Sequence, residues 1–97
     1  MAHYIGLLQW TQQGVEKVKE SPARLDAARQ AFASMGVTFK DIYLTMGQYD
    51  LICHMEAPDD ETLAKAILAV ASKGSVRTQT LRAFTEAEYR RIVASLP

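Results

Sequence analysis

Residues 37–57 read VTFKDIYLTMGQYDLICHMEA, and they are the part of the sequence that says most about the fold. It contains two strand-like segments rich in β-branched and aromatic side chains, separated by Gly47 and Gln48. A glycine at the first central position suits a two-residue type II′ turn, because that position needs a positive φ. We therefore predict an antiparallel β-hairpin, with strands at 37–46 and 49–57 and with Gly47 as the turn residue.

The register of this hairpin sorts its side chains onto two faces. If Gly47-Gln48 is the whole turn, Met46 lies opposite Tyr49, whereas a slip of one residue would exchange the two faces. The first face is apolar and should lie under helices: Ile42, Leu44, Leu51, Cys53 and Met55. The second face carries Phe39, Asp41, Tyr43, Thr45, Asp50, Ile52, His54 and Glu56, with Asp41 across from His54 and Tyr43 across from Ile52.

The rest of the chain completes a β-α-β-β-α-β order with one more helix at the C-terminus. The segment 4–10 is apolar on both parities, as in a central strand that is buried on both faces. Helix signals follow, including Ser21 as an N-cap with proline after it, a stop at Gly36 and a capping box from Thr85 to Glu88. The expected elements are strand 4–10, a helical turn at 11–18, helix 21–35, the hairpin, helix 58–73, strand 75–84 and a last helix from 85.

This order is typical of the ferredoxin-like α+β architecture, a four-stranded antiparallel sheet with two helices on one face. A length of 97 residues fits a single domain, 1–97. The helices leave one face open, and Phe39 and Ile52 give that face an apolar patch of the kind that marks an interface. We expect two copies to stack sheet on sheet into a dimeric α+β barrel, which could assemble further into a ring. The alternative is a monomer whose C-terminal helix folds back over the open face.

Composition limits the classes of partner. Lysine plus arginine and aspartate plus glutamate number 11 each, so the basic excess typical of nucleic-acid binding is absent. The single cysteine, Cys53, fits a reducing compartment and is expected to be buried. The N-terminus does not resemble a secretory signal, and no apolar run reaches the ~20 residues of a membrane span. We predict a cytoplasmic protein with neither nucleic acid nor membrane as a partner.

Several segments resemble the bacterial GYD domain family, in order and over essentially the whole chain. They are residues 10–14 (WTQQG), 46–51 (MGQYDL), 56–60 (EAPDD) and 76–85 (VRTQTLRAFT). The second carries the Gly-x-Tyr-Asp signature, with Gln48 at a position where an acidic residue is common. The resemblance implies a dimeric α+β barrel and no settled biochemical activity.

Two groups with the same fold suggest functions by analogy. The effector-binding domains of leucine-responsive/asparagine-type regulators carry a similar hairpin close to a small-molecule site. Small monooxygenases, isomerases and haem-handling enzymes use the cavity of the same barrel for chemistry.

Asp41, His54 and Tyr43 form the candidate catalytic group. An aspartate across from a histidine can raise its basicity, as a general base requires, and Tyr43 could donate a hydrogen bond to a developing oxyanion. The alternative is an exposed cross-strand pair worth less than ~1 kcal/mol. Glu56 could join as a metal ligand, but two acids and one histidine without a dense motif are a weak signal. We expect neither a metal nor a cofactor.

Tyr49, Asp50 and Thr45 are the candidate ligand-binding residues, at the mouth of the barrel cavity. The alternative for Tyr49 and Asp50 is that they serve the turn itself. No nucleotide-binding loop, hydrolase motif or zinc-ligand spacing is present. The sequence therefore favours a homo-oligomeric domain with a small-molecule-binding or accessory role. The alternative is a cofactor-independent enzyme, monooxygenase-like or isomerase-like, that works in the cavity between the two sheets.

Overall fold

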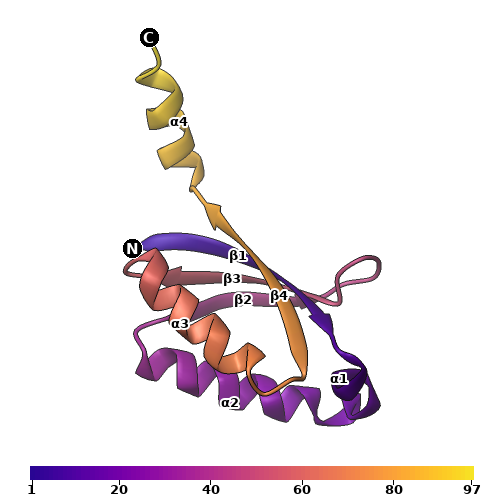
Figure 1. Cartoon of the computed structure of the whole chain (residues 1–97). Coiled ribbons are helices and arrows are strands. Elements are labelled where there is room, and N and C mark those ends of the chain that lie inside the picture. The colour runs from indigo at the N-terminus through magenta and orange to yellow at the C-terminus, as the bar shows by residue number, and fades with distance from the viewer.

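Four antiparallel strands form one sheet, in the order β2-β3-β1-β4, in the computed structural model, which describes all 97 residues (Figure 1). The strands are β1 (Ala2–Trp10), β2 (Thr38–Leu44), β3 (Leu51–Ala57) and β4 (Val76–Ala83). Helices α2 (Ser21–Ser34) and α3 (Asp60–Ala71) both lie on one face of the sheet. The predicted ferredoxin-like α+β fold is confirmed.

Capping residues mark where the short helices α1 and α4 begin. Helix α1 (Gln12–Glu16) begins after Thr11, whose side chain accepts a hydrogen bond from the N–H of Gly14. A 3-10 turn, η1 (Val18–Glu20), runs directly into α2, so Ser21 is the first residue of that helix and not its predicted N-cap. Helix α4 (Glu86–Ala94) starts with the predicted capping box, in which Thr85 and Glu88 satisfy each other's backbone N–H groups.

The hairpin has the predicted register but a longer connection. Leu44 lies opposite Leu51, and the Asp41–His54 and Tyr43–Ile52 pairs are also present. The strands end at these two leucines, so residues 45–50 form a loop in place of a two-residue turn. The N–H of Thr45 still donates to the carbonyl of Asp50 at 2.8 Å, which closes the loop, and the N–H of Asp50 donates to the carbonyl of Leu8 in β1. Gly47 has the positive φ that was predicted, at +128°.

A β-bulge in β2 corrects one predicted orientation. Phe39 lies opposite Met55 and Asp41 lies opposite His54, so Lys40 is an extra residue between the two pairs. The bulge turns Phe39 toward the helices, where its ring stacks on Phe32 with 4.8 Å between centroids. The prediction that Phe39 lies on the open face was therefore wrong. Regular alternation cannot reveal an inserted residue.

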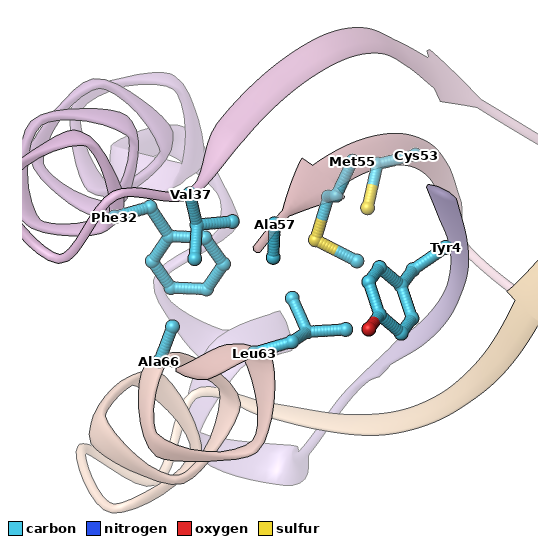
Figure 2. Close-up of a cluster of buried hydrophobic side chains, with 8 residues drawn as sticks. All are labelled: Tyr4, Phe32, Val37, Cys53, Met55, Ala57, Leu63 and Ala66. Carbon is cyan, nitrogen blue, oxygen red and sulfur yellow. The ribbon is translucent and has the colours of Figure 1, made fainter. Parts of the chain in front are cut away.

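The hydrophobic core lies between the two helices and the middle of the sheet (Figure 2). It joins β1 and β3 to the C-terminal half of α2 and the N-terminal half of α3. Its members are Tyr4, Phe32, Val37, Cys53, Met55, Ala57, Leu63 and Ala66. Gly6 makes this packing possible, because a Cβ there would lie 2.8 Å from the sulfur of Cys53. Cys53 is buried, as predicted, and burial raises the pKa of its thiol to about 11.

The second face of the sheet has no cover. Helix α4 extends away from the end of β4 and does not return over the sheet, so the expected alternative of a self-covered monomer is not what the chain forms (Figure 1). The large apolar side chains of α4, Tyr89, Ile92 and Val93, are exposed, and so is Leu96 just after the helix. None of the helices combines the length and the apolar character needed to cross a bilayer.

Candidate functional site

Two histidines meet on the open face of the sheet. His54 comes from β3 and His3 from the neighbouring β1, and the Nδ1 of His3 lies 3.0 Å from the Nε2 of His54. In such a hydrogen bond one ring nitrogen donates and the other accepts, so at least one imidazole is neutral at the shared position. The closest polar partner of His54 is therefore another histidine, and not the aspartate across the hairpin.

Carboxylates flank this histidine pair. The Oε1 of Glu56 lies 3.5 Å from the Nε2 of His3, and its other oxygen lies 3.4 Å from the Nζ of Lys40, the bulge residue. Asp41 is 3.9 Å from the Nδ1 of His54, beyond hydrogen-bond distance, and its side chain is 57% exposed. Glu56 and His3 are thus the more closely coupled acid and base on this face. No set of three or more histidine, cysteine, aspartate or glutamate side chains is arranged to hold a metal ion.

Apolar side chains occupy the centre of the open face. The strand registers align two rows across the sheet: Tyr43, Ile52, Leu7 and Gln79 in one row, and Asp41, His54, Ile5 and Leu81 in the next. Tyr43 is on the edge strand β2 and is 62% exposed, while Leu81 on β4 is 44% exposed. Tyr43 is therefore one row away from the histidine pair and open to solvent.

The loop 45–50 is tied to the sheet at several points. The carboxylate of Asp50 accepts a hydrogen bond from the N–H of Trp10 at 2.9 Å. Tyr49 reaches across to β4, where its hydroxyl donates to Gln79 at 2.7 Å. The hydroxyl of Thr45 donates to the carbonyl of Tyr49 at 2.6 Å, within the loop. All three predicted ligand-binding side chains therefore have partners inside the chain.

Residues 4–93 match the model of the GYD domain family, described as "GYD domain". The chain belongs to the GYD domain family. One relative is the "Glutamine synthetase and cystathionine beta-lyase binding protein" of Thermus thermophilus, which is 36% identical over 89 residues. The match covers 91% of this chain and 94% of the relative.

Solved structures show the same fold as this GYD domain. TTHA0845 from Thermus thermophilus has a TM-score of 0.57 at 25% identity, covering 88% of this chain and 95% of that one. FFRP-DM1 has a TM-score of 0.58 at 22% identity, covering 87% of this chain and 100% of the other. The second likeness concerns the fold alone.

The signature of this GYD domain has a clear structural role. Gly47 allows the positive φ, Tyr49 connects the loop to β4, and Asp50 connects it to β1. These contacts favour the interpretation that Tyr49 and Asp50 serve the hairpin. A role for these side chains in ligand binding stays a prediction.

Sequence reasoning found His54 but missed its partner. His3 lies near the N-terminus and carries no motif, and only the pairing of β1 with β3 brings the two rings together. A signal was nevertheless present, because His3 has the same parity as Ile5 and Leu7 in the first strand. The catalytic roles predicted for His54, Asp41 and Tyr43 stay predictions.

Proposed function

We propose that this GYD domain is an accessory protein that binds other proteins, and that it does so as a homodimer in the cytoplasm. The observation that carries the proposal is the uncovered sheet face, with the apolar side chains of Ile5, Leu7, Ile52 and Leu81 in its two central rows. Contiguous apolar surface without cover favours association. Cytoplasmic reducing conditions would keep Cys53 as the free thiol that its burial favours.

A second copy is the partner that suits this face best. Fully burying an aliphatic or aromatic side chain stabilises by about 1.5–3 kcal/mol, and the face offers several such side chains. The polar group of His3, Glu56 and Lys40 lies at one end of the patch, where a protein interface has its polar rim. Ile52 would lie at the centre of the contact, as the sequence predicts, while Phe39 belongs to the core and contributes nothing to it.

The class of partner protein is proposed from the relative. Its name specifies glutamine synthetase and cystathionine beta-lyase, and it aligns with nearly the whole of this chain. We propose enzymes of these two kinds as partners. Helix α4 is the element best placed to reach them, because its apolar stripe is exposed and extends beyond the sheet (Figure 1).

The test is sedimentation velocity, with and without the two enzymes from the same organism. We expect a dimer at micromolar concentration that co-sediments with at least one enzyme. Ile52→Asp should give a folded monomer, because it places a charge in a desolvated contact, and should weaken enzyme binding by about tenfold through lost bivalency.

Ala23→Asp is the matched control, since it adds the same charge at an exposed position in the first turn of α2. It should leave both assemblies intact. A wild-type protein that sediments as a monomer would contradict the dimer, and failure to bind either enzyme would contradict the accessory role.

The second candidate is a cofactor-independent enzyme, and the histidine pair favours it. A second sheet stacked on the open face would leave His3 and His54 at the edge of the space between the two sheets, and a neutral imidazole there is a suitable general base. A thermal-shift screen of metabolites distinguishes the enzyme from the accessory protein. A metabolite that stabilises the wild type but not His54→Gln supports this candidate, and equal stabilisation of both proteins contradicts it.

A further inference from the structure

A second apolar feature lies on the opposite side of the sheet. A cavity of about 150 Å³ lies between α2 and the strands, and 11 of its 15 lining residues are hydrophobic. It lies under the N-terminal half of α2, beside the C-terminal end of α3. The tightly packed core is at the other end of these helices, around Phe32 and Leu63 (Figure 2). The space between the helices and the sheet is thus close-packed around Phe32 and Leu63, and it contains the cavity under the N-terminal half of α2.

The size of the side chains explains the hollow. Of the five residues of α2 that line the cavity, Ser21, Ala27 and Ala28 are small, whereas Phe32, about one turn after Ala28, is fully buried in the core. The other hydrophobic lining residues do not close the gap: Leu8, Trp10, Leu25, Phe39, Ile42, Leu51, Cys53, Val70 and Val76. Protein interiors are normally close-packed, so an unfilled apolar volume of this size indicates space for a guest.

The charged side chains at the cavity are all positive. The four lining residues that are not hydrophobic are Ser21, Arg24, Lys73 and Ser75, which supply two cations, two hydroxyls and no carboxylate. The guanidinium of Arg24 donates to the carbonyls of Lys17 and Gly14, so it is held in place beside the cavity. Lys73 forms none of the ion pairs in the structure. This arrangement is complementary to an anionic group on an apolar body.

We propose that the cavity binds a small aromatic carboxylate, with the ring between α2 and the sheet and the carboxylate beside Arg24 and Lys73. Apolar cavities of about this volume accept molecules the size of benzene, which sets the guest at a single ring. The site is distinct from the open face and does not depend on the proposed accessory role. Its test is therefore independent of dimerisation and of enzyme binding.

The only tryptophan of the chain, Trp10, lines the cavity and reports on it directly. The experiment is a titration of Trp10 fluorescence with phenylacetate and, as the uncharged match, phenylacetamide. We expect saturable changes with both, and binding of phenylacetate about fivefold tighter because only the carboxylate is attracted by the two cations. No saturable change at millimolar phenylacetate, or equal affinity for both compounds, would overturn the proposal.

Two variants test separately the apolar wall of the cavity and the cations beside it. Ala28→Leu fills the cavity and should weaken both compounds by about tenfold or more, whereas Ala23→Leu on the exposed side of α2 should weaken neither. Lys73→Met should weaken phenylacetate alone and bring the two affinities close together. If Ala28→Leu does not fold, the affinity of Lys73→Met for phenylacetate tests the proposal. Unchanged phenylacetate binding in Lys73→Met would show that the carboxylate lies elsewhere.

Discussion

Asp50 links two parts of the chain that are far apart in sequence. Its carboxylate accepts from the N–H of Trp10 at 2.9 Å, and its own N–H donates to the carbonyl of Leu8 at 2.8 Å. This hydrogen bond between Trp10 and Asp50 is part-buried. The side chain therefore has a structural role that does not require a ligand.

We predict that Asp50→Ala lowers the free energy of unfolding by about 1–3 kcal/mol, because it leaves a part-buried N–H without an acceptor. Asp41→Ala is the control, since that carboxylate is 57% exposed and makes no hydrogen bond, and it should cost less than ~0.5 kcal/mol. Urea denaturation at neutral pH measures both. Equal losses in the two variants would refute the structural role of Asp50.

Tyr4 and Cys53 make stability depend on alkaline pH. Burial and the hydrogen bond to Asp60 raise the pKa of the Tyr4 phenol from 10.0 to about 12, and burial raises the pKa of the Cys53 thiol from 9.0 to about 11. In the unfolded chain both groups ionise at their ordinary values. The folded state thus holds more protons in this range, and stability should fall as pH rises from about 9 to 12.

Urea denaturation at a series of alkaline pH values measures this loss. Tyr4→Phe should make the decline shallower above about pH 10, because it removes the phenol that ionises more readily in the unfolded chain. The part due to Cys53 should persist in that variant at lower pH. An unchanged slope in Tyr4→Phe would show that the phenol is not responsible.

At the scale of elements, β2 and α4 depart most from regular packing. The bulge at Lys40 exchanges the faces on either side of it, so Phe39 joins the core while Lys40 reaches Glu56 on the open face. Helix α4 has an apolar stripe and a polar side, on which Glu86 and Arg90 form an ion pair. A helix with such an exposed stripe is suited to an external partner.

Deleting residues 86–97 should therefore leave the domain folded but impair recognition of the enzymes. Because α4 extends away from the sheet, we expect the melting temperature to change by less than about 4 °C, equivalent to less than ~1 kcal/mol. Enzyme binding, followed by interferometry, should weaken at least ~tenfold.

Point variants of α4 control for loss of chain length. Ile92→Ser on the apolar stripe should reproduce most of the loss, and Arg90→Ser on the polar side should not. If the deletion binds the enzymes as well as the full chain does, α4 is not the contact. If it fails to fold, the view of α4 as an independent arm is wrong.

At the scale of the whole molecule, the sheet separates two different surfaces. The helix-covered side contains the core and, under α2, the apolar cavity with its cationic rim. The open side contains an apolar centre with the histidine pair and Glu56 at one end. We therefore propose different partners for the two sides, a small molecule on the helix-covered side and a second copy of the chain on the open side.

Local pattern was sufficient for most of the fold. The order of elements, the hairpin pairing of Asp41 with His54, the burial of Cys53 and the capping box at Thr85 were all predicted and are present. Each depends on residues close together in the chain, through periodicity, turn chemistry or capping. For the candidate site, the sequence predicted the sheet face that carries His54 but not the contact of His54 with His3.

Three other features depend on how the helices and strands pack together. The face of Phe39 depended on a bulge, the partner of His54 depended on β1 lying beside β3, and the cavity depended on where small side chains of α2 meet the sheet. These features join residues that are distant in sequence, so they follow from strand order and packing and not from any local pattern. Local sequence patterns were enough to predict which helices and strands form and which way most of their side chains face. Only their assembly determined which side chains meet and where space is left between them.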